Sequence, residues 1–191
     1  MAAERSTEAF ADPAAFRAWL VEHHATSPGI WLKIGKKAGG RVLLSHDQAV
    51  DVALAFGWID GQARPGDETH WLQGFTRRTS RSPWSKRNCA KAELLIAAGE
   101  MDPSGQAEVD RAKADGRWAK AYDGQRDIQE PPDFLEALAA NSAAQAFYPT
   151  LSRVNRYAIL YRIHEAKRPE TRARRIANFV EMLGRSETIH G

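Results

Sequence analysis

Residues 56–91 decide the fold of this chain, and they read FGWIDGQARPGDETHWLQGFTRRTSRSPWSKRNCAK. Two short runs of bulky, β-prone residues, 58–62 and 70–76, flank the turn-forming residues 64–67, as is typical of two strands joined by a turn. Side chains alternate across a strand, so Trp71 and Phe75 are expected on the same face of the second strand. This stretch therefore predicts an antiparallel strand pair.

The residues before this stretch add helices and a third strand. Pro13 follows an aspartate and opens a predicted helix, and residues 29–34 are short, apolar and β-prone. Ser45 and Gln48 have the spacing of a capping box at a second helix, which Gly57 is placed to end. We predict an α+β fold, with a small, mainly antiparallel sheet of about three strands packed with helices.

The remainder of the chain has helical patterns. Ser82 followed by proline predicts a helix start, and Pro169 opens a last helix with an apolar stripe through Ile176 and Val180. We predict three parts: an α+β domain over residues 1–123, a Gly- and Pro-containing linker over 124–133, and an all-helical C-terminal domain over 134–191.

Composition limits the classes of function. The chain has 191 residues, 43% hydrophobic content and a formal net charge of +3. Cys89 is its only cysteine, so an intramolecular disulfide is impossible, and six scattered histidines show no metal-ligand spacing. No apolar run approaches the ~18 residues of a membrane span. We expect a cytoplasmic protein without membrane insertion, metal or cofactor.

The second half of the opening stretch is strongly basic. Between Thr76 and Lys91 there are six lysines and arginines and no acid, in a chain with 24 acidic residues. Guanidinium groups suit phosphate and carboxylate, and an exposed tryptophan could stack on bases. The candidate anion-binding residues are Arg77, Arg78, Arg81, Trp84, Lys86, Arg87 and Lys91. The alternative is a solvated charged face with Trp84 packed inward.

Other chemistry has weaker signals. A small-molecule pocket is the rival interpretation, built from Trp58, Asp60, His70 and Trp71. Asp60 would be either a general base or one partner of a structural salt bridge. Cys89 lies near cations that can lower a thiol pKa, yet free cysteines are commonly buried apolar residues. We assign no catalytic residue, and no phosphate-binding glycine loop occurs.

The last predicted helix contains a second basic group. Arg168, Arg172 and Arg175 share a face opposite Ile176. A basic helix after a helix pair can resemble a DNA-reading unit, or it can be the soluble outer face of a helical hairpin.

Three segments, residues 56–61, 75–86 and 166–176, together resemble the YdeI/OmpD-associated (OmdA-like) bacterial family, whose members are labelled bacteriocin-protection proteins. The likeness extends from about residue 31 to residue 183. It implies a cytoplasmic bacterial protein tied to resistance against antibacterial peptides or proteins, and it brings no catalytic residues.

The leading hypothesis is a non-enzymatic bacteriocin-protection or stress-resistance protein that binds nucleic acid or an acidic protein through the basic stretch. The first alternative is a small-molecule-binding protein or enzyme, with a pocket near Trp58, Asp60 and His70. The second is an adaptor whose helical C-terminal part docks a partner.

Overall fold

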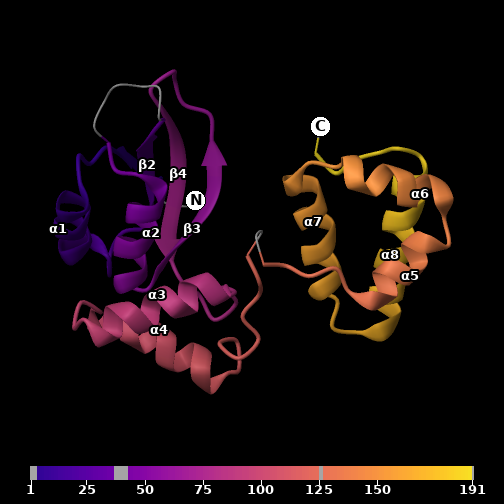
Figure 1. The fold of residues 1–191 in the computed structure, drawn as a ribbon. Helices are drawn as coiled ribbons and strands as arrows, with labels where there is room; N and C mark the ends of the chain where they lie inside the picture. Colours follow the sequence, from indigo (N-terminus) through magenta and orange to yellow (C-terminus); the bar gives the residue numbers. More distant parts are fainter. Residues whose placement is uncertain (1–3, 37–42, 125–126, 191) are drawn as a thin grey trace. The chain divides into compact units, whose positions relative to one another are not determined.

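The computed structural model describes residues 4–36, 43–124 and 127–190. The chain forms two compact units, Met1–Ala121 (unit 1) and Tyr122–Gly191 (unit 2), each with its own apolar core (Figure 1). Unit 1 contains the sheet, and unit 2 is helical, so the predicted α+β class with a helical C-terminal part is confirmed.

The sheet of unit 1 has four strands in the order β1-β2-β4-β3. They are β1 (Ser6–Glu8), β2 (Ile30–Gly35), β3 (Trp58–Arg64) and β4 (His70–Arg77). The strand β4 pairs antiparallel with both β2 and β3, as the mainly antiparallel pattern predicted. The short strand β1 pairs parallel with β2. Hydrophobic periodicity could not reveal β1, because its three residues are all polar.

The helices of unit 1 are α1 (Pro13–His23), α2 (His46–Ala55), α3 (Lys86–Ala97) and α4 (Pro103–Ala114). Phe16 of α1 and Ala53 of α2 are fully or almost fully buried in one core cluster with Ile30, Ile34 and Phe75 of the sheet. The alternation of β2 and β4 therefore directs one face of the sheet toward α1 and α2.

The end of α2 is a close contact point for α4. Gly57 has φ +70, and a Cβ at this position would lie 2.9 Å from the backbone oxygen of Ser104. At Gly105 a Cβ would lie 2.1 Å from the backbone oxygen of Ala55. Glycine at both positions allows the helix to approach the chain this closely. This approach places the first turns of α4 beside the junction of α2 and β3.

The start of α3 differs from the prediction at Ser82. The helix begins at Lys86, and its N-cap is Ser85, whose Oγ accepts a hydrogen bond from the backbone N–H of Asn88 at 3.1 Å. Ser82 closes a turn instead, since its Oγ accepts a hydrogen bond from the N–H of Thr79 at 2.9 Å. Both serines have a side chain that can cap a helix. Ser82 instead accepts a hydrogen bond within the turn at 79–82, and Ser85 caps α3.

Unit 2 consists of α5 (Pro132–Ala139), α6 (Ser142–Phe147), the 3-10 helix η1 (Tyr148–Thr150), α7 (Arg153–His164) and α8 (Pro169–Gly184). Helix α5 begins within the residues predicted as linker. Pro169 is the first residue of α8, and Ile176, Val180 and Leu183 are buried in the core as the helical periodicity predicted.

Candidate functional site

Two of the candidate anion-binding residues, Arg78 and Trp84, are in the interior of unit 1. Trp84 is 2% exposed and Arg78 is 5% exposed. The guanidinium carbon of Arg78 lies 3.8 Å from the centroid of the Trp84 ring, and Nη1 donates a hydrogen bond to the Pro83 carbonyl at 3.0 Å. Trp84 also packs against Trp118 at 4.9 Å between ring centroids. Trp84 therefore offers no exposed face for stacking on a base.

The cations of α3 lie beside acids of another helix. Arg87 pairs with Asp47 at 3.0 Å, and the ammonium of Lys91 forms a short contact with the Asp51 carboxylate. Both aspartates belong to α2, about 40 residues earlier in the chain. The stretch from 76 to 91 has no acid in sequence, but its second half is paired with acids in space.

Arg77 lies at the exposed end of β4, and unlike Arg87 and Lys91 it donates to a neutral group. Its Nη1 donates a hydrogen bond to the Ala25 carbonyl at 2.8 Å. A neutral carbonyl fixes the direction of a guanidinium without cancelling its charge. Arg81 and Lys86, the remaining candidates, are exposed.

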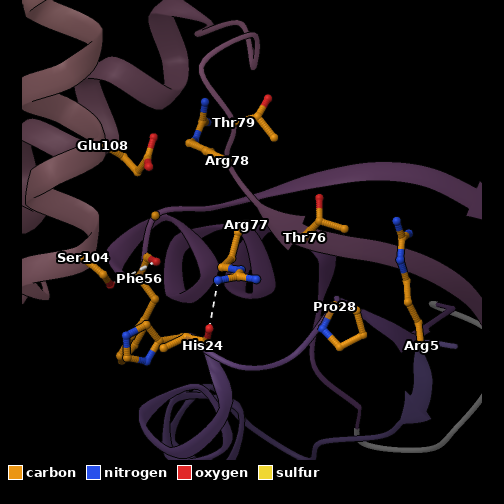
Figure 2. A pocket seen from close by; sticks show the side chains of 12 residues that line it. Arg5, His24, Pro28, Phe56, Thr76, Arg77, Arg78, Thr79, Ser104 and Glu108 are labelled. Carbon is orange, nitrogen blue, oxygen red and sulfur yellow. Dashed lines mark hydrogen bonds between the residues drawn. The ribbon is translucent and has the colours of Figure 1, made fainter. Parts of the chain in front are cut away.

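Arg77 and Arg78 border a cavity of about 680 Å³. Figure 2 shows its wall, which combines the junction of α2 and β3, the end of β4, the first turns of α4, and residues before β1 and after α1. The lining residues are Arg5, His24, Ala25, Pro28, Phe56, Gly57, Thr76, Arg77, Arg78, Thr79, Ser104 and Glu108. This volume lies within the ~300–1,000 Å³ of small-molecule sites.

The lining of this cavity is predominantly cationic. Arg5 and Arg77 bring two guanidinium groups and Glu108 brings one carboxylate, whereas the guanidinium of Arg78 is buried against Trp84. The carboxylate of Glu108 also forms a short ion pair with Arg111 of the same helix. Figure 2 places Arg5 and Glu108 on opposite sides of the view, with Arg77 between them. The cavity is thus suited to holding an anion.

Arg5 reaches the cavity because of close packing at the sheet edge. A Cβ at Gly29, which has φ +130, would lie 2.9 Å from Arg5 Nε and 2.8 Å from the Phe75 carbonyl oxygen. The guanidinium carbon of Arg5 also lies 5.7 Å from the centroid of the Trp31 ring. Strand β1 and Gly29 together hold this arginine at the cavity.

Two further lining groups have structural hydrogen bonds. His24 Nδ1 lies 2.8 Å from the carbonyl oxygen of Leu20, at the end of α1. The hydroxyl of Ser104 donates to the Asp102 carboxylate at 2.6 Å, within the N-terminal cap of α4. These contacts favour a role for both residues in building the wall.

The thiol of Cys89 is also structural in character. Cys89 is 8% exposed and packs with Trp84, Ala92 and Val109. Burial raises the pKa of the Cys89 thiol to about 11, although the charge of Arg78 acts in the opposite direction. At neutral pH the group is a thiol, and the thiolate is the nucleophilic form.

The residues of the rival pocket lie at separate places in unit 1. Asp60 pairs with Phe75 in the sheet, whereas His70 is five residues away at the other end of β4, or roughly 17 Å at the ordinary strand rise. Asp60 contacts His46 at 3.3 Å, and His70 contacts Asp67 at 2.8 Å. The structure does not bring the two predicted pocket residues together.

The two tryptophans of that rival pocket belong to the core around the sheet. Trp58 is 1% exposed, and its indole N–H donates to the His24 carbonyl at 3.2 Å. Trp71 is partly buried against the same core cluster. None of the four predicted pocket residues lines the 680 Å³ cavity.

Asp60 is paired with His46 of α2 at 3.3 Å. Partial burial raises the pKa of its carboxyl, but the hydrogen bond and charge of His46, with the charge of Arg78, outweigh that effect. The pKa of Asp60 therefore lies below its ordinary value, which is the direction expected for a paired carboxylate. A general base needs the opposite shift.

The basic residues of unit 2 are partly paired. Arg172 donates to both carboxylate oxygens of Asp133, from Nε at 2.6 Å and from Nη2 at 2.8 Å. Its Nη1 donates to the Ile163 carbonyl at 3.0 Å, and Arg175 donates to the Arg162 carbonyl. These bonds connect α8 to α5 and α7, so Arg172 has a structural role in unit 2.

Metal and membrane sites have no support in the described part of the chain. Residues 4–36, 43–124 and 127–190 contain no cluster of three or more His, Cys, Asp or Glu side chains that could hold a metal ion. Among the helices formed by these residues, none has the length and apolar character needed to cross a bilayer.

Of the twelve lining residues, only Arg77 and Arg78 were among the candidates drawn from the sequence, and the residues missed include Arg5, His24, Ser104 and Glu108. No local motif connects them, because they come from three segments that are distant in the chain. The only signal at Arg77 and Arg78 was charge density, which did not distinguish them from Arg87 or Lys91.

The fold and the cavity define an α+β protein that has an arginine-bordered site in its first unit and a helical second unit. Residues 8–108 match the family model described as "Domain of unknown function (DUF8412)", which covers more than half of the chain. The chain belongs to this family.

Residues 127–186 match a second family model, OmdA, described as "Bacteriocin-protection, YdeI or OmpD-Associated". This match confirms the family resemblance that the sequence motifs predicted. The motif at 166–176 lies within it, whereas those at 56–61 and 75–86 lie within the first match. No curated protein and no solved structure matched the chain.

Proposed function

We propose that this chain acts in bacteriocin protection or stress resistance by binding an anionic partner at the cavity of unit 1, without catalysing a reaction. The observation behind this proposal is that Arg5 and Arg77 line one cavity of about 680 Å³. The family description of residues 127–186 supports the protective role.

The surroundings of the basic stretch favour a compact anionic group over a long polyanion. Non-specific nucleic-acid binding uses a row of cations along the backbone, and single strands also use exposed aromatic rings. Arg87 and Lys91 are paired with aspartates, and Trp84 is buried. What remains is a concave site that suits one phosphate or carboxylate group.

The wall of the cavity also supports binding without catalysis. Nucleophilic catalysis needs a nucleophile within hydrogen-bond reach of a base. The hydroxyl of Ser104 donates to Asp102, and Nδ1 of His24 is occupied by the Leu20 carbonyl. Both side chains are thus engaged in bonds that shape the wall.

Arg77→Ala tests the proposal, and Arg81→Ala is its matched control. Both residues are exposed arginines of the same basic stretch, but only Arg77 lines the cavity. Titration calorimetry with inorganic phosphate at low salt should show about tenfold weaker binding for Arg77→Ala, corresponding to ~1.4 kcal/mol for a lost charge-assisted hydrogen bond. Arg81→Ala should change the affinity by less than about twofold.

A labelled single-stranded oligonucleotide and labelled polyglutamate provide the polyanion arms of the same experiment. On the proposal, both should compete with phosphate for the Arg77 site only weakly, because the cavity suits one compact anionic group. Equal losses for Arg77→Ala and Arg81→Ala would contradict it, because the exposed face rather than the cavity would then hold the anion. The absence of any binding by phosphate, oligonucleotide and polyglutamate would also contradict it.

A further inference from the structure

The charge of the cavity narrows the class of ligand. The cationic end of the lining has the two guanidinium groups of Arg5 and Arg77, and the lining carboxylate, that of Glu108, is paired with Arg111. A phosphate monoester has a charge of about −1.5 to −2 at pH 7, whereas a carboxylate has a charge of only −1. Arginine's planar fork also matches the oxygens of a phosphate group. The balance of charge therefore favours a phosphate monoester.

The positions of the charged groups indicate how a ligand would be oriented in the cavity. Arg5 lies on one side of the cavity and Glu108 on the other, with Arg77 between them (Figure 2). An ionised carboxylate accepts hydrogen bonds and repels phosphate. A ligand with its phosphate toward Arg5 and Arg77 would thus direct its other end toward Glu108, where hydroxyl groups can donate.

The remaining lining can accommodate an organic skeleton. Pro28 and Ala25 provide apolar surface for it. Thr76 lies on the same side as Arg5 in Figure 2 and adds a hydroxyl to the cationic part of the cavity. Inorganic phosphate would use only the cationic part of this volume.

We propose that the cavity binds a phosphate monoester of a hydroxylated carbon skeleton, with the phosphate held by Arg5 and Arg77 and a hydroxyl group donating to Glu108. This inference rests on the proposed function, since it requires that the cavity binds an anion. Two sources have the same chemistry, sugar phosphates and nucleoside monophosphates, and both fit a cavity of this size.

Titration calorimetry of the full chain tests the ligand class. The probes are inorganic phosphate, glucose 6-phosphate and adenosine monophosphate, with glucose and adenosine as their unphosphorylated counterparts. At least one monoester should bind about five- to tenfold more tightly than inorganic phosphate, and glucose and adenosine should not bind measurably. The ratio of the two monoesters' affinities distinguishes a sugar phosphate from a nucleotide.

Glu108→Gln separates the two ends of the site. It should weaken the tighter monoester about three- to tenfold and leave inorganic phosphate unchanged or slightly tighter, because a negative charge is removed. Glu93→Gln is the matched control, since Glu93 is an exposed carboxylate of α3 outside the cavity. Arg77→Gln should weaken both phosphate ligands about tenfold and serves in place of Arg77→Ala if that variant does not fold.

Three results would overturn the inference, and they differ in whether anion binding at the cavity remains supported. If inorganic phosphate binds in an Arg77-dependent manner but neither monoester is tighter, the ligand class is wrong and anion binding remains. The same holds if Glu108→Gln leaves the monoester's advantage over inorganic phosphate intact. If neither phosphate nor a polyanion binds, the proposed function fails together with the inference.

Discussion

Arg77 and Lys91 belong to the same acid-free stretch of sequence, yet they lie in different electrostatic surroundings. Arg77 donates to a neutral backbone carbonyl and borders a cavity with two further arginines. Lys91 contacts the carboxylate of Asp51 on α2. The difference shows that a run of like charges does not define a binding surface until the segments packed against it are known.

The largest effect is expected inside the stretch, at Trp84. Trp84→Ala should lower the free energy of unfolding of unit 1 by about 3–5 kcal/mol, because a large buried side chain is replaced by a cavity. Urea denaturation followed by circular dichroism measures this change. The exposed neighbour Arg81 is the control, with an expected change within about 0.5 kcal/mol for Arg81→Ala. A similar small change at Trp84 would mean that the ring is not a core residue.

A smaller effect with a distinct pH signature is expected at Asp60. Asp60→Asn should lower the free energy of unfolding at pH 7 by less than about 1 kcal/mol, since the pair with His46 is a third exposed. The pKa of Asp60 is lower in the folded state than its ordinary value of 3.8. The stabilisation is therefore present above that value and is lost as pH falls through the folded pKa.

Denaturation curves collected between pH 7 and pH 2 test this expectation. The curves of the wild-type chain and Asp60→Asn should converge at the acid end. The difference between the two curves should become smaller when His46→Ala is present in both, because His46 makes the side-chain hydrogen bond to Asp60. A difference that persists unchanged at the lowest pH would contradict the assignment.

The smallest effect is expected at the pair formed by Lys91 and Asp51. A double-mutant cycle with Lys91→Ala and Asp51→Ala should give a coupling of about 0.5 kcal/mol, which decreases with added salt. Lys91→Ala should change phosphate affinity by less than about twofold, in contrast to Arg77→Ala. A tenfold loss at Lys91 would place the anion on α3 and away from the cavity.

Most of the fold could be predicted from local patterns. The capping box of Ser45 and Gln48 is present at α2, and Pro169 opens α8 with its apolar stripe buried. These signals act within one turn of a helix, so neighbouring residues suffice to specify them. Strand β1 was missed because its three polar residues show no hydrophobic periodicity. The start of α3 was misplaced because Ser82 and Ser85 are both residues that can cap a helix.

The candidate site could be predicted only in part, since only two of its charged residues lay within the basic stretch. Arg77 and Arg78 were among the seven candidates, but charge density alone could not separate them from Arg87. No sequence pattern marked Arg5 or Glu108 as a site residue, because the residues around each one do not indicate that the two lie near the same cavity. Gly29 and Gly57 permit the close contacts on each side of the cavity, yet that role depends on partners distant in the chain.

The local chemistry of the sequence thus settled that the chain is α+β and, apart from β1 and the start of α3, which segments become helices and strands, because capping, turn formation and apolar periodicity operate over a few residues. Tertiary structure alone decided which arginines are paired with acids and which line a cavity that a ligand can enter. Asp47 and Asp51 of α2 pair with Arg87 and Lys91 at one end of the basic stretch, while Arg5, just before β1, and Glu108 of α4 line the cavity at the other end. Charge pairing and cavity formation depend on distances in space, which packing of remote segments sets.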